Sequence, residues 1–471
     1  MAIEPDHTGC FAGLRNSFRS STRKRPGSSE RTSLYDKLSP PKPPLRDDDL
    51  AATTYQCWCC HHPLDPPHAL EAPPAYSELA HTHEPTALKT IRDAVDKYSD
   101  DLRKLSMDIH DHPEIMFEER HAHDVLTTFL SAHGFTVTRH YLDLPTAWRA
   151  EYKRGTGGRT IGINSEMDAL PGIGHGCGHN LIAMAGVAIA LGVKAALDQH
   201  HVDGHIVLLG TPAEEGGAGK VMLLERGGYD GMHATHPLVG PPHSAQVGTS
   251  LAIQTIDVEF FGRTAHASAA PWEGQNALDA AFLTYSAISV LRQQIKPTHR
   301  VHGVIKGPSN LAANVIPDYT SMSWFVRAPS WTELEVLRKR VESCIEAGAL
   351  ASSCKVKISL GRAQYDLRQN PILQSGLASI LDSEFEWQTL EGQSGGSTDF
   401  AMPALHPHFA IIDDPSIVAH TPGFRDAAAT KKAHDAALTI SKALAMIGFR
   451  VVDDEGFYGE VKEAFDKGQS S

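Results

Sequence analysis

The sequence has little cysteine, no excess of positive charge and no long hydrophobic run. Its seven cysteines among 471 residues show no evenly spaced disulfide framework, a pattern typical of a reducing compartment. The formal net charge of −13 argues against a nucleic-acid-binding protein. The longest apolar run, Leu181 to Val193, is too short for a bilayer span, and the amino terminus shows no signal-peptide core. We therefore expect a soluble, cytoplasmic protein with no membrane span and no nucleic-acid partner.

The first 85 residues differ from the rest in composition. They contain a basic patch, proline-rich segments and an acidic triplet, which are typical of a disordered chain. Cys57-Trp58-Cys59-Cys60 could bind a soft metal or be acylated. No second ligand pair follows at zinc-finger spacing, so reactive side chains in a tail are the favoured interpretation. Pro41-Lys-Pro-Pro-Leu-Arg46 and Pro73-Pro-Ala-Tyr76 have the forms that SH3 and WW domains recognise, but such short patterns often arise by chance.

From about residue 87 the apolar pattern predicts an α/β protein. Runs at 160–163 and 205–209 indicate buried strands, each followed by a polar loop and a helix, and this alternation implies an open sheet. From residue 250 the order becomes strand, helix, strand, strand, helix, strand, which predicts a separate two-layer domain inserted in the first. The predicted helices cover residues 88–109, 117–133, 181–197, 219–225, 276–294, 332–347 and 427–447.

The stretch from Glu166 to Asn180 joins a predicted strand to a predicted helix. Loops of this kind carry the chemistry of α/β enzymes. The stretch contains Asp168, Cys177 and His179 within twelve positions of sequence, and a carboxylate, a thiolate and an imidazole suit a borderline metal such as zinc. Its alternating glycines suggest a dinucleotide-binding loop, but their spacing does not match that fingerprint.

Two adjacent carboxylates, Glu214 and Glu215, follow the next predicted strand. Neighbouring negative charges repel unless a cation binds one of them, so the economical assignment is one metal ligand and one general base acting on a metal-bound water of pKa ~7. A bridging ligand would let two metals lie ~3.5–4 Å apart. His236 and His420 also fall at predicted strand ends. Any one of the 27 histidines is more often a surface residue than a ligand, but the joint pattern favours a metal site.

These residues resemble peptidase family M20, and most closely its amidohydrolase branch. The resemblance spans about residues 87 to 450 in order, and the ordered set of motifs is specific. His236-Pro237 and Gly396-Ser-Thr-Asp399 favour the side of the branch that includes the aminobenzoyl-glutamate hydrolases and peptidase M20 domain-containing protein 2. The other matching motifs are His110-Asp-His-Pro-Glu114, Phe117-Glu-Glu119, Met167-Asp-Ala-Leu-Pro171, Gly176-Cys-Gly-His179, Pro212-Ala-Glu-Glu215, Gly262-Arg-Thr-Ala-His-Ala-Ser268, Asn314-Val-Ile-Pro317 and His420-Thr-Pro-Gly-Phe424.

The resemblance implies a metal centre and a general base. Glu214 would be the general base and proton shuttle, and Asp168 would orient a ligand. Asn180 stands where the family commonly has aspartate, which changes a carboxylate to an amide beside the metal without removing a ligand. Thiolate ligation favours zinc, although members of the branch also use manganese or cobalt. Two divalent ions, with the Cys177 thiolate between them, would be held by Cys177, His179, Glu215, His236 and His420.

The resemblance also assigns residues of the inserted domain. His266 resembles a histidine that reaches into the partner subunit's active site, where it would stabilise the oxyanion of a tetrahedral intermediate. Asn314 and Arg327 resemble a pair that binds a substrate carboxylate, a task that suits the planar guanidinium. The alternative for Arg327 is a surface ion pair. If His266 acts in the partner's site, the protein is a homodimer joined through about residues 246–365.

The implied fold is a phosphorylase/hydrolase-like α/β catalytic domain with a mixed sheet, plus an inserted ferredoxin-like lid and dimerisation domain. The implied function is metal-dependent hydrolysis of the amide bond of N-acyl or N-aroyl amino acids, or of unusual dipeptides. The alternative is a non-catalytic scaffold of the same fold, recruited through its proline-rich tail; no feature indicates the free-amine pocket of a general aminopeptidase. The expected boundaries are 1–85 for a disordered extension, 86–245 and 366–451 for the catalytic domain, 246–365 for the lid domain and 452–471 for a flexible tail.

Overall fold

The computed structural model describes residues 84–229, 232–233, 236–307, 312–393, 397–398 and 405–469. Within these ranges the side chains of residues 84, 232–233, 236–239, 393 and 468–469 are not described. The predictions for the N-terminal extension, including the Cys57 cluster and the two proline motifs, lie outside the described residues.

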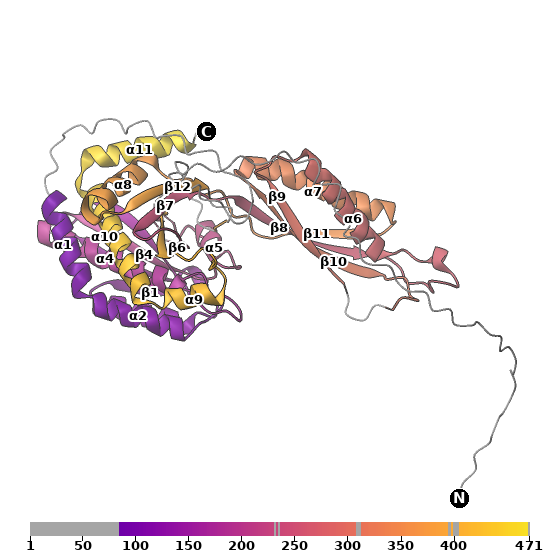
Figure 1. Cartoon of the computed structure of the whole chain (residues 1–471), viewed down its shortest axis with the longest axis horizontal. Coiled ribbons are helices and arrows are strands. Elements are labelled where there is room, and N and C mark those ends of the chain that lie inside the picture. Colours follow the sequence, from indigo (N-terminus) through magenta and orange to yellow (C-terminus); the bar gives the residue numbers. More distant parts are fainter. Residues whose placement is uncertain are drawn as a thin grey trace, which may run out of the picture. The chain divides into compact units, whose positions relative to one another are not determined.

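A five-stranded mixed sheet carries the polar loops of interest (Figure 1). Its strand order is β1-β2-β4-β3-β5; β3 runs parallel to β4 and β5, whereas β1–β2 and β2–β4 are antiparallel pairs. Ile161, Ile163, Ile206 and Leu208 of the central strands are at most 2% exposed, as expected where both faces of a sheet are covered. The strands are β1 (Thr136–Arg139), β2 (Trp148–Arg154), β3 (Arg159–Glu166), β4 (Gly204–Thr211) and β5 (Met232–His233).

Helix α4 (His179–His200) is the centre of the main hydrophobic core. Every residue from His179 to Val193 is buried, and α1 (Glu84–Lys97), α2 (Ser99–Asp111) and α10 (Lys431–Asp453) pack against it. Among the described residues α4 alone is long and apolar enough to cross a membrane, and 89% of its most apolar window is buried inside the protein. A helix that is covered by other elements on all sides has this composition.

The sequence predicted one open sheet for the α/β region. In the described residues, however, the other strands of this region form a second, separate sheet. Its order is β12-β7-β13-β6, with β7 antiparallel to β13 and the outer pairs parallel. The sequence did not predict β7 and β12, because polar residues and glycines interrupt their apolar pattern. This part comprises β6 (His236–Val239), β7 (Ser244–Thr249), β12 (Gln388–Gln393), β13 (His408–Ile412), α8 (Pro371–Phe385) and α9 (Pro422–Ala428).

A third sheet, with the antiparallel order β11-β8-β10-β9, is formed by the part of the chain between β7 and β12. Helices α6 and α7 share one hydrophobic cluster with it, and Figure 1 shows both helices running along the sheet. Phe260 and Trp324 at the centre of that cluster are fully buried. The elements in chain order are β8 (Ala252–Phe261), α6 (Ala277–Leu291), β9 (Arg300–Lys306), β10 (Tyr319–Ala328), α7 (Trp331–Ala351) and β11 (Lys355–Leu360).

Two expectations about helices are wrong. The single helix predicted over 88–109 is two helices, because Tyr98 has the non-helical angles φ −99° and ψ 6°; the break lets both α1 and α2 contact α4. The segment 452–471, predicted to be flexible, contains helix α11 (Glu455–Gln469). Phe457 of α11 is 3% exposed and belongs to the main core, so tertiary packing orders a segment whose composition is polar.

Candidate active site and metal centre

The parallel pairing of β3 and β4 brings two polar loops to one edge of the first sheet. Glu166, the last residue of β3, lies opposite Thr211, the last residue of β4. Each strand then continues into a loop, one containing Asp168 and the other containing Glu214 and Glu215. Because the carboxyl ends of parallel strands share an edge, the two loops meet there.

Asp168 joins the two loops through hydrogen bonds. Its carboxylate is 1% exposed and accepts the backbone N–H groups of Glu214 at 3.1 Å and Glu215 at 3.0 Å. It also lies 3.1 Å from Nδ1 of His179. Burial alone would raise the pKa of Asp168, but His179 and the N–H of Glu215 hold that pKa below its ordinary value. Burial alone would lower the pKa of His179, but the carboxylate of Asp168 holds it well above its ordinary value.

Two groups of ligand-type side chains form around this junction. One ligand atom from each member lies within 4.8 Å of the others in its group. Because Nδ1 of His179 is bound to Asp168, its Nε2 faces Glu166 Oε2 at 3.5 Å and Glu214 Oε2 at 3.8 Å. The first group is Cys177, Glu215 and His420, and the second is Glu166, His179 and Glu214.

Four of the residues predicted as ligands, Cys177, His179, Glu215 and His420, thus lie together at one site. His420 comes from the loop after β13, and its backbone N–H donates to the carbonyl of Gly176 at 2.8 Å. Its Nε2 lies 3.4 Å from Glu215 Oε2, while 53% of its side chain is exposed. His236 begins β6, but its side chain lies outside the described residues.

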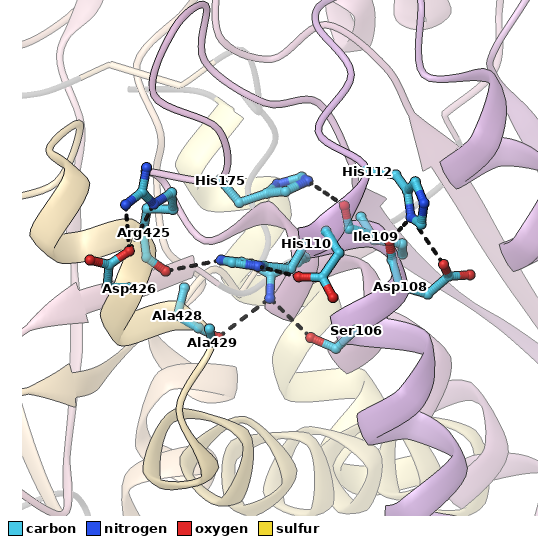
Figure 2. Close-up of polar contacts among 12 residues, drawn as sticks. Ser106, Asp108, Ile109, His110, His112, His175, Arg425, Asp426, Ala428 and Ala429 are labelled. Atoms are coloured by element: carbon cyan, nitrogen blue, oxygen red, sulfur yellow. Dashed lines mark hydrogen bonds and ion pairs between the residues drawn. The ribbon is translucent and has the colours of Figure 1, made fainter.

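The glycine-rich loop before α4 holds Cys177 in a buried position. Gly178 has a φ of +79° at the N-terminus of α4, a conformation that glycine adopts without strain. Figure 2 shows His175 of this loop pointing to the carbonyl of Ile109 on α2, at 3.1 Å from Nε2. Burial lowers the pKa of His175 to about 3 and raises the pKa of the Cys177 thiol. A metal would favour the thiolate instead.

Sequence reasoning missed a buried ion pair at the edge of this cluster. Nζ of Lys220, on α5 (Gly219–Glu225), lies 3.0 Å from Oε1 of Glu166. Glu166 is completely buried and Lys220 is 1% exposed. The sequence did contain a signal, because Glu166 is a charged residue at the end of an otherwise buried strand, and such residues are almost never buried without a partner.

Glu119 is a second carboxylate that sequence reasoning recorded only as part of a motif. It is fully buried and accepts the N–H of Ala213 at 2.9 Å and the hydroxyl of Thr146 at 2.6 Å. Ala213 has a φ of +59°, which is strained for a residue with a Cβ. Burial raises the pKa of Glu119 to about 7. Glu119 therefore holds the strained residue that directly precedes Glu214.

His266 lies between β8 and α6, in the region of the third sheet. The hydrogen bonds to its ring determine its tautomer. Nδ1 is 3.3 Å from the N–H of Ser268 and 3.2 Å from the N–H of Ala269. Since backbone N–H groups only donate, Nδ1 accepts and Nε2 carries the proton. The side chain is exposed. In the part of the chain that the structure describes, no hydrogen bond or ion pair joins His266 to the ligand groups.

Asn314 and Arg327 have different surroundings. Asn314 is exposed, and its carbonyl accepts the N–H of Ala267, so it neighbours His266 in space. Arg327 of β10 is half-buried and donates from Nη1 to the hydroxyl of Ser397 at 3.0 Å. Burial lowers the pKa of Arg327. Among the described residues no carboxylate lies within ion-pair distance of it, so the alternative of a surface ion pair has no support there.

The charges around the ligand groups fit a bound cation. Both carboxylate oxygens of Glu166 and Oε1 of Glu215 are buried and accept no hydrogen bond within the described ranges, although Lys220 lies beside Glu166. Buried carboxylates cost free energy unless cations balance them. A thiol, imidazoles and carboxylates together are the donor set that zinc and related divalent ions bind.

Comparison with known proteins places these residues in a family. A family model described as Peptidase family M20/M25/M40 matches residues 162–437. The chain is 38% identical over 398 residues to the human protein named Xaa-Arg dipeptidase, covering 79% of this chain and 90% of the relative. It is 31% identical over 322 residues to a p-aminobenzoyl-glutamate hydrolase component of Escherichia coli, covering 64% of this chain and 66% of that protein.

Solved structures show the same fold at lower identity. One is a Bacillus subtilis protein described as a dinuclear metal binding peptidase from the M20 family, with a TM-score of 0.59, 20% identity, and coverage of 76% of this chain and 99% of that chain. Another is an aminobenzoyl-glutamate utilization protein from Klebsiella pneumoniae, with a TM-score of 0.57, 17% identity, and coverage of 77% and 99%.

Proposed function

The chain belongs to peptidase family M20/M25/M40, and from this premise we propose that it is a metal-dependent hydrolase of dipeptides or of N-acyl and N-aroyl amino acids. The observation that carries the proposal is the pair of ligand groups joined by the adjacent residues Glu214 and Glu215. The relatives named as a dipeptidase and a hydrolase support an enzyme, so the scaffold alternative is not favoured.

The proposed metal centre takes two divalent ions. Zinc is the first choice because of the thiolate, with manganese and cobalt as alternatives. When bound, such ions polarise the amide carbonyl and lower the pKa of water to ~7. Glu166 lies in the same group as His179 and adds a ligand candidate that the family resemblance did not supply. The proposed ligands from the sequence are Cys177, His179, Glu215, His236 and His420.

Glu214 is the proposed general base. It takes a proton from the attacking water and later gives it to the leaving amine. Its backbone is fixed by Asp168 on one side and by the Glu119-bound residue Ala213 on the other. Its side chain is only 10% exposed, so little of the carboxylate is in contact with bulk solvent.

His266 is the proposed oxyanion donor. The Nδ1 hydrogen bonds leave the proton on Nε2, the donor that a developing negative oxygen requires. We propose that Arg327 and Asn314 bind the carboxylate of the substrate. Arg327 is half-buried and has only the neutral hydroxyl of Ser397 as its described hydrogen-bond acceptor, so a carboxylate would gain a charge-assisted bond there.

We also propose a homodimer through the region from Ala252 to Leu360, acting as a lid and dimerisation domain with a ferredoxin-like arrangement. Phe282 and Val290 of α6 are 58% and 69% exposed, and Val304 of the edge strand β9 is 56% exposed. Exposed apolar side chains of this size favour an interface. We propose that, in this dimer, the partner's His266 acts in each active site.

The test is metal restoration on the purified, full-length chain. After chelation, we expect no cleavage, and we expect zinc, manganese or cobalt to restore it. The substrates are dipeptides with carboxyl-terminal arginine, aminobenzoyl-glutamate, β-alanyl and γ-aminobutyryl dipeptides, and N-acyl amino acids. Metal-independent cleavage, or two bound ions without turnover of any of these amides, would contradict the proposal.

A further inference from the structure

A third group of metal-ligand side chains lies away from the active site. Asp108 and His112 come from the end of α2, and His121 comes from the first turn of α3 (Arg120–Ala132). One ligand atom from each lies within 4.8 Å of the other two. Figure 2 shows His112 joined to Asp108, while His110 points instead toward the carbonyl of Arg425.

The three side chains converge on a single oxygen atom. Oδ1 of Asp108 lies 3.1 Å from Nδ1 of His112 and 3.1 Å from Nε2 of His121. Nδ1 of His112 also lies 2.8 Å from the backbone carbonyl oxygen of Asp108, and a bound ion would replace this hydrogen bond. The two imidazole ring centroids are 4.4 Å apart. Nε2 of His121 is inaccessible to solvent and makes no hydrogen bond within the described residues. Two imidazoles and one carboxylate, with their ligand atoms within 4.8 Å of one another, supply the donor types of a mononuclear metal site.

The positions of these ligands are fixed by rigid elements. Asp108 lies in the last turn of α2, and His112 directly follows the helix, where its backbone N–H donates to the carbonyl of Ile109. The carboxylate of Glu114 accepts the N–H groups of His121 at 2.9 Å and Ala122 at 3.1 Å, which ties the start of α3 to the end of α2. A site built on two fixed helix ends loses little conformational entropy when an ion binds.

The carboxylate of Asp108 has no described lysine or arginine partner that would compete with a metal ion. In the part of the chain that the structure describes, no lysine or arginine lies within ion-pair distance of Asp108, and its ion-pair partners are the two histidines. Side-chain exposures of 58% for His112, 40% for Asp108 and 36% for His121 give an ion and its water ligands access from solvent.

We propose that Asp108, His112 and His121 bind a divalent transition-metal ion of the zinc type, separate from the active-site ions, with water completing its coordination. Two imidazoles and one carboxylate favour zinc, cobalt, nickel or copper over magnesium and calcium. The ion would link α2 to α3. It would also brace the intervening loop, where the carbonyl of Glu114 accepts the N–H of Ala169 at 2.8 Å, directly after Asp168.

The test compares metal content between variants of the full chain. Metal-stripped wild type, His121→Gln, Asp108→Asn and His140→Gln are equilibrated at buffered free zinc concentrations and analysed for zinc per chain. His140 is the matched control, because it is exposed and stacks on His123 at 4.9 Å but belongs to none of the three ligand groups. We expect wild type and His140→Gln to bind one more zinc per chain than His121→Gln and Asp108→Asn.

The difference between variants, not the total, decides the outcome. Failure of the active-site proposal would lower the zinc content of all four proteins equally and leave the difference intact. Equal zinc content of all four proteins at every free zinc concentration would overturn the third site.

With cobalt, we expect the thiolate charge-transfer band from Cys177 to be unchanged in Asp108→Asn. Loss of that band would show that the substitution had removed an active-site ion and would also overturn the proposal. If His121→Gln does not fold, Asp108→Asn carries the comparison alone.

Discussion

The functional side chains of the active-site cluster are buried, whereas those of the region from Ala252 to Leu360 are largely exposed. In the cluster, Glu166, Asp168 and His179 are at most 1% exposed, and their polar atoms face one another within the chain. In the other region, His266 is exposed, and Phe282 of α6 leaves 58% of its surface to solvent. This difference supports the proposal that one chain supplies the metal ligands and the general base, whereas a partner subunit supplies His266.

The largest effect is expected from Glu214→Gln, inside the cluster. The amide cannot accept the proton of water, so we expect kcat to fall by about 10²–10⁴-fold while the metal content stays constant. Glu118→Gln is the matched control, because that side chain is 60% exposed, and it should retain wild-type kcat. Turnover by Glu214→Gln at the wild-type rate would remove Glu214 from the mechanism.

Lys220→Met tests the buried ion pair. It removes the lysine that lies beside Oε1 of Glu166 and leaves only His179, among the described basic residues, near that carboxylate, so we expect the metal-free protein to lose about 3–5 kcal/mol of unfolding free energy, measured by chemical denaturation. The double variant Lys220→Met/Glu166→Gln should recover part of that loss, because it removes the uncompensated charge. A single variant as stable as wild type would mean that solvent or another group neutralises Glu166.

His266→Ala tests whether the exposed histidine acts in the partner's site. Loss of an oxyanion donor should lower kcat by about 10²–10³-fold. Mixing His266→Ala with Glu214→Gln, after dissociation and reassociation, should then restore about a quarter of the sites, since half of random dimers are mixed and each holds one intact site. A mixture as inactive as its components would show that His266 acts within its own chain.

The smallest effect on the fold is expected from Phe282→Asp/Val290→Asp on α6. Charges on this surface should convert the dimer to a monomer, as measured by light scattering, with little change in Tm. Activity should fall to about the level of His266→Ala. Val336→Asp on α7 is the control, because Val336 is equally open at 61% exposed. A dimer that persists in the double variant would place the interface elsewhere.

Much of the site could be predicted from the sequence because its residues follow strands. Cys177 and Glu215 lie in the loops that follow β3 and β4, His179 begins the helix after the first of these loops, and the start and end of α5 fall where the sequence placed them. The contact between Glu166 and Lys220 could not be predicted, since it depends on the register of β3 against β4 and on where α5 packs. Similarly, α11 is ordered by the contact of Phe457 with the core, which local composition does not reveal.

The hydrogen bonds of Asp168 have a mechanical consequence. One carboxylate holds the backbone of both glutamates and the ring of His179, so none of the three can shift without displacing the others. Asp168 therefore couples Glu215 of one ligand group to His179 and Glu214 of the other. A substrate that presses on either glutamate strains the whole centre at once, and selectivity for the shape of the amide can arise from the stiffness of this junction as well as from the walls of the pocket.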